Sequence, residues 1–292
     1  MSPMKARAFH ATTLADTIVV VPDHLTDDTS VRRLAAACGS PIVAQHDFDA
    51  TDFAKVHVIA CGHLANNAAV TRLYNARCCF VDTLFPGNDD YLVRSIRDPF
   101  GAGHNAIVTG ASSDKGLRDA AAELAKCVEA SDGVLDRVHI HQLASGPKQP
   151  ASSQLDGLIA KDLATWHGGW VASPFCGGQL KSYLWHQYLD DGDVWGHLIK
   201  GIFAGSIDLW REQRALEPHG YHDFFHLDHF IHLWDLVEDH PVYTKQDRHA
   251  VVEMFIDLLR HLAGLFYLQQ EVNPDGIPRQ NHTTFVGLNL AA

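Results

Sequence analysis

The chain has 292 residues, of which 46% are hydrophobic, and it carries a formal net charge of −12 at neutral pH. A chain of this length and apolar content can bury a sizeable core, and we expect it to fold as two domains. Its acidic balance argues against nucleic acid or an anionic membrane surface as a partner. No apolar stretch of the sequence approaches the roughly 20 residues that a membrane span needs.

The first ten residues include basic side chains, but no apolar run follows them, so we expect no signal peptide. The first apolar stretch, residues 17–21, is too short for one and ends at Pro22. Six cysteines occur without a Cys-x-x-Cys pair, and several lie in apolar segments. This pattern favours reduced, buried thiols over a disulfide framework and leaves the cytoplasm as the default location.

Residues 1–145 alternate short apolar stretches with amphipathic ones, which is typical of an α/β layer domain. The predicted strands cover residues 17–21, 41–44, 56–60, 78–82, 91–97, 105–110 and 134–141. The predicted helices cover residues 30–38, 66–74 and 115–128. Asp114 stands directly before the last of these helices, where a short polar side chain commonly caps the first turn.

Residues 146–153 are rich in proline, glycine and serine and predict a linker. Residues 154–292 show helical periodicity without strand signals. The predicted helices cover residues 154–166, 178–189, 195–212, 224–238 and 245–270. Most of the large aromatic side chains in this part are expected to pack between helices. The predicted fold class is therefore an α/β domain followed by an all-helical domain.

A polar segment near the C-terminus places Arg279 and Gln280 directly before Asn281 and His282. These residue types suit the abstraction of a proton beside a sugar carboxylate. The C5 proton of a uronic acid is too weakly acidic to remove while the carboxylate keeps its full negative charge. Donors such as Arg, Gln and Asn can neutralise that charge, and an imidazole can act as a base near neutral pH.

This segment, together with Leu-Trp-Asp-Leu-Val at 233–237 and Thr-Lys-Gln-Asp-Arg at 244–248, resembles the toroidal polysaccharide lyases of the heparinase II/III and alginate lyase type. The resemblance covers residues 154–292. It implies a partial (α/α) toroid that acts by β-elimination on an acidic, uronate-containing polysaccharide or oligosaccharide, with no cofactor and no metal. It also implies that Asn281 and His282 are catalytic, while Arg279 and Gln280 bind the substrate.

The pattern of this family is only partly present. Thr283 stands where Gly or Ser often follows the histidine, and the downstream tyrosine that commonly serves as acid or base has no clear counterpart. Tyr243 and Tyr267 are poor substitutes, because both are expected to pack. The remaining toroid helices and the C-terminal β-sandwich have no counterpart either. We therefore expect the chain to be a fragment with weak or no activity, since a misplacement of about 1 Å can cost roughly a hundredfold in rate.

Three other interpretations of the C-terminal half remain open. Asn281 could cap a helix that begins near Thr283, after the turn residues 273–278. A glycoside hydrolase with paired carboxylates is a second alternative, because (α/α) toroids host that reaction too. A non-catalytic module that binds carbohydrate or docks a partner is the third.

A histidine-rich stretch contains His219, His222, His226, His229 and His232. On a helix, the second, third and fourth of these share one face and could hold a metal ion. The stretch contains no His-Glu-x-x-His motif and no nearby thiolate. The favoured interpretation is a polar helix face, with His222 and His226 lining the substrate groove and no metal bound.

Two further motifs have simple explanations. Residues 108–116 resemble the nucleotide-binding turn of short-chain dehydrogenases, but Asp114 replaces the middle glycine and would repel a phosphate. The chain has no Tyr-x-x-x-Lys pair, so we expect no nicotinamide cofactor. Residues 190–193 lack the spacing and the final glutamate of an EF-hand, and they indicate a turn between helices.

Overall fold

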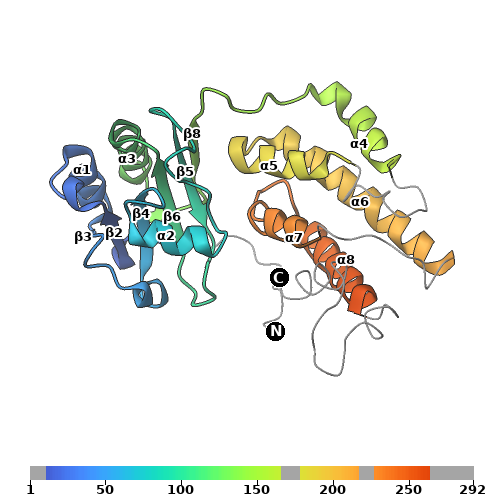
Figure 1. Ribbon diagram of the computed structural model, residues 1–292, viewed down its shortest axis with the longest axis horizontal. Coiled ribbons are helices and arrows are strands. Elements are labelled where there is room, and N and C mark those ends of the chain that lie inside the picture. The colour runs from blue at the N-terminus through green and yellow to red at the C-terminus, as the bar shows by residue number, and fades with distance from the viewer. Residues whose placement is uncertain (1–10, 166–177, 217–226, 264–292) are drawn as a thin grey trace, which may run out of the picture. The chain divides into compact units, whose positions relative to one another are not determined.

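The computed structural model describes residues 11–165, 178–216 and 227–263. The chain divides into two compact units, and the division lies between Gly146 and Pro147, at the start of the predicted linker. The N-terminal unit has strands and helices, whereas the described residues of the second unit, the helical unit, form helices only (Figure 1). The described part holds eight α-helices and a six-stranded sheet, which confirms the predicted α/β content.

The sheet of the N-terminal unit is mostly parallel. In spatial order its strands are β3 (Ile42–Ala44), β2 (Thr17–Val21), β4 (His57–Gly62), β6 (Ala106–Ala111), β5 (Tyr91–Ile96) and β8 (His139–Gln142). The first four run parallel, and β5 is antiparallel to both of its neighbours. A separate antiparallel pair joins β1 (Thr12–Thr13) to β7 (Val134–Leu135). Short 3-10 helices occur at Leu14–Asp16, Asp23–Leu25, Ala50–Ala54 and Ser152–Gln154.

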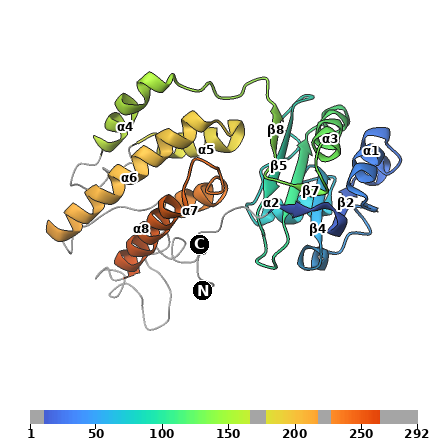
Figure 2. The same cartoon turned by 180° about the vertical axis from the view of Figure 1, so that it is seen from behind.

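Helices cover both faces of this sheet (Figures 1 and 2). One core contains residues of α1 (Thr29–Cys38) and α3 (Asp114–Glu129), and the other contains residues of α2 (Ala68–Asn75). Because side chains alternate along a strand, Val19 belongs to the first core and Val20 to the second. Burial on both faces explains why these strands read as unbroken apolar runs.

Two expectations about strands were wrong. Residues 78–82 form a loop, although Cys79 and Val81 are buried. These two side chains belong to the core around α2, and the carbonyl of Val81 accepts a hydrogen bond from the amide of Leu64 in another loop. Their apolar character therefore serves to cover the sheet, not to extend it. The predicted strand at residues 134–141 is divided between β7 and β8, which belong to different sheets.

The cap of α3 also differs from the prediction. Ser113, not Asp114, is the capping residue, and its Oγ accepts a hydrogen bond from the amide of Gly116 at 3.1 Å. Ser113 has an extended backbone (φ −130°, ψ 157°), which lets its side chain fold back onto the first turn. Asp114 is already the first helical residue, and its carboxylate contacts His24 instead.

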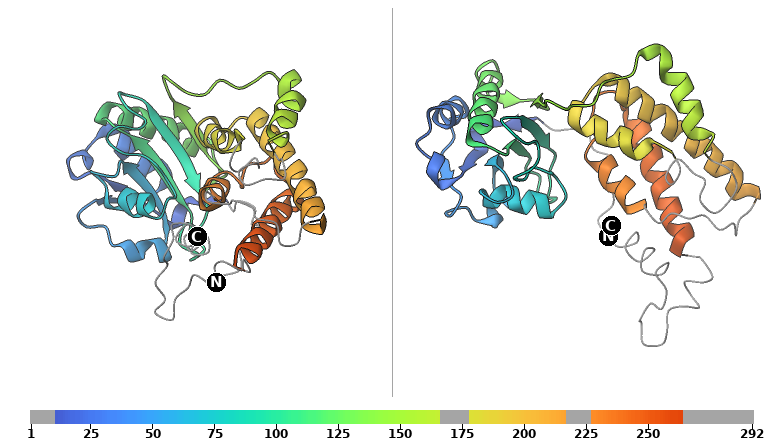
Figure 3. Two further views of the ribbon diagram at one scale, coloured as in Figure 1. Left: turned by 45° about the vertical axis from the view of Figure 1, so that its right-hand side comes forward. Right: turned by 45° about the horizontal axis from the view of Figure 1, so that its top comes forward.

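The predicted helices beyond the linker are confirmed within the described residues. They are α4 (Leu155–Leu163), α5 (Leu180–Asp190), α6 (Asp193–Leu216), α7 (Leu227–Asp235) and α8 (Lys245–Ala263). Each helix packs against the helix two places further along the chain: α4 contacts α6, α5 contacts α7 and α6 contacts α8 (Figure 3). The helices α5 and α6 also contact each other as a hairpin.

Glycines of α6 let α4 approach closely. A Cβ atom on Gly201 would overlap the side chain of Ile159, and one on Gly205 would overlap that of Leu163. The two glycines lie one helical turn apart and therefore share a face. Side chains of α4 fill the space that larger residues of α6 would need.

Three of the cysteines are buried, as predicted. Burial raises the pKa of Cys38 to about 11 and the pKa values of Cys61 and Cys79 to about 12, so these side chains are thiols at neutral pH. Cys127 is exposed, and Cys176 lies outside the described residues. Among the described helices, none is long and apolar enough to cross a membrane.

Candidate functional site

The predicted site residues Arg279, Gln280, Asn281 and His282 lie outside the described residues, and so do His222 and His226. Their roles therefore stay predictions, as does the alternative in which Asn281 caps a helix. The described segment from α7 to α8 connects the two predicted site segments along the chain. His226 directly precedes α7, and the segment beginning at Arg279 follows α8.

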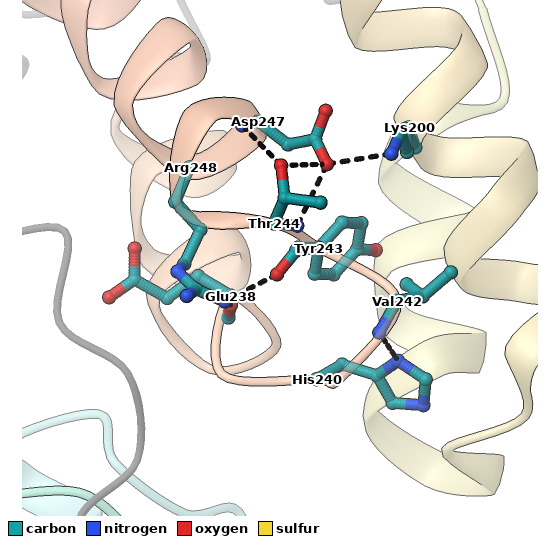
Figure 4. A network of polar contacts seen from close by, with 8 residues as sticks. All are labelled: Lys200, Glu238, His240, Val242, Tyr243, Thr244, Asp247 and Arg248. Carbon is teal, nitrogen blue, oxygen red and sulfur yellow. Dashed lines mark hydrogen bonds and ion pairs between the residues drawn. The ribbon is translucent and has the colours of Figure 1, made fainter.

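The start of α8 is fixed by a reciprocal capping arrangement (Figure 4). The amide of Asp247 donates to the Thr244 hydroxyl at 3.1 Å, and the Asp247 carboxylate accepts from both the amide and the hydroxyl of Thr244 at 2.8 Å. The Lys200 ammonium of α6 lies 2.7 Å from the same carboxylate. Burial acts to raise the pKa of Asp247, but the hydrogen bonds from Lys200 and Thr244 outweigh it and lower that pKa.

The turn between α7 and α8 closes around a buried arginine (Figure 4). The Arg248 guanidinium donates to the carbonyl of Tyr243 at 2.6 Å and to the carbonyl of Glu238 at 3.4 Å. Tyr243 is only 2% exposed, and its ring lies 4.9 Å from that of Trp234. Residues 233–237 and 244–248, which carry part of the family resemblance, thus build a rigid joint. Tyr243 packs in this joint, as predicted, so it is a poor candidate for the acid of a lyase.

A buried histidine links this joint by a hydrogen bond to the turn between α5 and α6. The ring of His240 is 3% exposed; its Nδ1 accepts from the amide of Val242, and its Nε2 donates to the carbonyl of Asp191 at 3.0 Å. Asp191 ends α5 in the left-handed conformation, with φ 55°. The Asp190 carboxylate accepts from the indole of Trp195 at 3.1 Å. The interpretation of residues 190–193 as a turn between helices is therefore confirmed.

Part of the histidine-rich stretch lies on α7. The Lys181 ammonium of α5 lies 3.0 Å from Nδ1 of His229, and the neighbouring Asp228 carboxylate lies 3.6 Å from Nε2 of that ring. The predicted partners His222 and His226 are outside the described residues. Within the part of the chain that the structure describes, no three His, Cys, Asp or Glu side chains are grouped so that they could hold a metal ion.

The turn at residues 108–116 is filled by the protein's own backbone. A Cβ atom on Gly116 would lie 2.9 Å from the carbonyl oxygens of both Asp89 and Asp90. Gly116 therefore allows the close approach of a neighbouring loop, in the place where a nucleotide-binding turn would admit a pyrophosphate.

Sequence reasoning did not single out the polar residues that follow the parallel strands. Asp23 and His24 come just after β2, and His46 follows β3. The His46 ring lies 2.7 Å from the Asp23 carboxylate, and Nε2 of His24 lies 3.0 Å from both carboxylate oxygens of Asp114. The signal available in the sequence was a polar side chain directly after each buried strand. Only the strand order shows which of these residues meet.

Comparison of the chain with protein-family models, with curated proteins and with solved structures found no match. The resemblance to toroidal lyases therefore rests on the residues quoted for it.

Proposed function

We propose that this chain acts on an acidic, uronate-containing glycan by β-elimination, with the reaction carried by its helical unit. The observation that carries the proposal is the segment from Arg279 to His282, in which three hydrogen-bond donors precede an imidazole. This combination supplies both charge neutralisation and a base near neutral pH.

The packing of the described helices supports a partial (α/α) toroid as the scaffold. Such a ring is built from successive helical hairpins in which each helix packs against the helix two places further along. The contacts of α4 with α6, of α5 with α7 and of α6 with α8 have this spacing.

The chemistry assigned to each residue follows from the charges that develop. Arg279 and Asn281 donate hydrogen bonds to the uronate carboxylate and so stabilise the negative charge that spreads onto it. His282 takes the C5 proton, the electron pair of that C–H bond forms a C4–C5 double bond, and the C4–O bond breaks. The departing oxygen takes a proton from an acid. Gln280, His222 and His226 hold the neighbouring sugar.

The hydrogen bonds of the α7–α8 joint support this proposal. Catalytic groups must be held to within a fraction of an ångström, because a displacement of about 1 Å can cost roughly a hundredfold in rate. The capping of α8 by Thr244 and Asp247 and the buried Arg248 fix the turn that links the two site segments in sequence. A site built from the segments before α7 and after α8 requires these two helices to be held in place.

The test is an elimination assay on the full chain with alginate, polygalacturonate, heparin, chondroitin and hyaluronan. Elimination leaves an unsaturated sugar that absorbs in the near ultraviolet, and we expect such absorbance to appear slowly on one of these glycans, in keeping with the weak activity expected of this chain. His282→Ala and Asn281→Ala should each lower the rate by roughly a hundredfold or more. His249→Ala is the matched control, because His249 is an exposed histidine on α8.

The outcomes separate the competing functions. Release of reducing ends without new absorbance would identify a hydrolase and refute the lyase proposal. Glycan binding that survives both substitutions, without turnover, would identify a non-catalytic binding module.

A further inference from the structure

The carboxyl edge of the N-terminal sheet has the topology of a ligand site. The chain leaves β2 towards its neighbour β3 through α1, then returns to β4 on the other side of β2 and continues into α2. The helices α1 and α2 lie on opposite faces of the sheet, so the loops after β2 and β4 separate. Ligands of open α/β sheets bind in the crevice that forms where neighbouring loops diverge in this way.

Three polar side chains follow the adjacent strands β2, β4 and β6 at this edge of the sheet. His24 follows β2, His63 follows β4 and Asp114 follows β6. Because β4 lies between β2 and β6, the contact of His24 with Asp114 at 3.0 Å passes across the end of β4. The carboxylates of Asp114 and Asp82 both act electrostatically on His63. His24 is 57% exposed and Asp114 is 43% exposed, so a ligand can reach them from solvent.

The loop that carries His63 is held rigidly. Gly62 has φ +134°, and a Cβ atom there would lie 2.5 Å from Oδ1 of Asn66, which itself accepts the amide hydrogen of His63 at 2.7 Å. Beneath it, the buried Asn67 donates to the carbonyl of Val20 in β2 and to the carbonyl of Cys61 in β4. The His63 ring thus stands on a preorganised loop, as a binding group must.

Hydrogen bonds fix which ring atoms face a ligand as donors and acceptors. Nδ1 of His63 accepts the amide hydrogen of Ala65 at 3.2 Å, so the proton of the neutral ring is on Nε2, which becomes a donor. Burial lowers the pKa of His63, which keeps the ring neutral at pH 7. When neutral, His24 donates through Nε2 to Asp114 and leaves Nδ1 as an acceptor. The Asp114 carboxylate adds further acceptor positions.

The charge around this cluster selects the class of ligand. The carboxylates of Asp23, Asp82 and Asp89, and that of Asp114 at the start of α3, lie at this edge. The nearby cations are already paired, since His46 contacts Asp23 and Lys115 contacts Asp119 and Asp89. Phosphates and uronates would be repelled here. Alternating donors and acceptors beside carboxylates suit the hydroxyl groups of an uncharged sugar.

We propose that His24, His63 and Asp114 form a second binding site, separate from the proposed lyase site, that takes a neutral, hydroxyl-rich ligand such as an uncharged sugar. The site belongs to the N-terminal unit and does not depend on the predicted catalytic segment.

The test is NMR titration of the full chain with glucose, galactose and mannose, following the imidazole nitrogens of His24 and His63. We expect saturable shifts of both rings with at least one sugar, and none at His57 on the opposite edge of the sheet. Asp114→Asn and His63→Gln should each weaken binding by roughly tenfold. Glu129→Gln is the control, because Glu129 ends the same helix and pairs with Arg33 of α1, away from the residues of the proposed site.

Three results would overturn the proposal. The first is the absence of a saturable shift with all three sugars. The second is equal affinity in wild type and in both site variants, with folding checked by circular dichroism. The third is equal binding of glucuronate or inorganic phosphate, which would refute the charge argument.

Discussion

In the N-terminal unit the buried carboxamide of Asn67 makes four hydrogen bonds, whereas in the helical unit the buried carboxamide of Gln187 makes none to the residues that the structure describes. Nδ2 of Asn67 donates to one carbonyl of β2 and one of β4, and its Oδ1 accepts from two amides in the first turn of α2. Gln187 is fully buried in α5, and the buried Ser206 Oγ and Trp234 Nε1 also lack hydrogen-bond partners within the described ranges. The Asn67 carboxamide thus links distant elements of its unit by hydrogen bonds, whereas the Gln187 carboxamide is buried without such links among the described residues.

This difference can be measured because the two units have different optical reporters. All six tryptophans follow the predicted linker, so tryptophan fluorescence reports on the helical unit. Far-ultraviolet circular dichroism reports on both units. A substitution that destabilises only the helical unit should move the fluorescence transition. A substitution that destabilises only the N-terminal unit should change the circular dichroism curve and leave the fluorescence transition in place.

The largest effect is expected for Asn67→Ala. It leaves two strand carbonyls and two helix amides without partners inside the protein, and unsatisfied buried groups cost about 1–3 kcal/mol each, partly relieved by water. We expect a loss of about 3–5 kcal/mol in the free energy of unfolding of the N-terminal unit. Urea titration followed by circular dichroism measures it. Asn75→Ala, at an exposed position of α2, is the control; equal losses in the two variants would contradict the prediction.

A smaller loss is expected for Gly205→Val in the helical unit. The added side chain would collide with Leu163 of α4, and overpacking of this kind costs about 1–3 kcal/mol. Tryptophan fluorescence during urea titration should show the midpoint move to lower urea. Gly157→Ala in α4 is the matched control, because a Cβ atom there meets nothing within 4 Å. This control should stabilise the unit by about 0.5–1 kcal/mol, and a loss there would show that the contact surface is misassigned.

A gain is expected for Gln187→Met, which replaces the unpartnered carboxamide by an apolar side chain of similar shape. Burial of an unsatisfied polar group is unfavourable, so the helical unit should become more stable by about 1 kcal/mol. Gln187→Glu should instead destabilise the unit, because it would bury a charge. A clear loss of stability in the methionine variant would mean that the carboxamide is hydrogen-bonded in solution.

The smallest effect concerns the pH dependence of the N-terminal unit. Burial, followed by repulsion from His104, lowers the pKa of His57, whose Nδ1 accepts the amide hydrogen of Asn105 at 2.8 Å. The unfolded chain takes up this proton near pH 6.5, and the folded chain only at lower pH. The contribution to stability is therefore present above about pH 6.5 and is lost as the pH falls below it.

Thermal unfolding followed by circular dichroism between about pH 8 and pH 5 tests this sign. His57→Gln should flatten the acid branch of the curve, while His249→Gln, at an exposed position of α8, should leave it unchanged. An unchanged acid branch in the first variant would assign the pH dependence to other groups.

The sequence determined the local elements of both units. Apolar runs marked β2, β4 and β6, helical periodicity marked the five helices after the linker, and the Pro/Ser/Gly-rich stretch marked the division between the units. These features follow from interactions between residues close in the chain, such as backbone hydrogen bonding and the spacing of apolar side chains on one face. The segment from Arg279 to His282 was also visible in the sequence, but its geometry lies outside the described residues.

Only the tertiary structure decided which distant residues meet. The loop at residues 78–82 read as a strand because Cys79 and Val81 are apolar, yet they are buried by covering the sheet. His24 and Asp114 are 90 positions apart in the chain and come together through the strand order. Glycine usually destabilises a helix, but Gly205 leaves the space that the Leu163 side chain occupies. The physical reason is common to all three: burial and contact depend on which surfaces pack together, and a local sequence pattern carries no information about its partner.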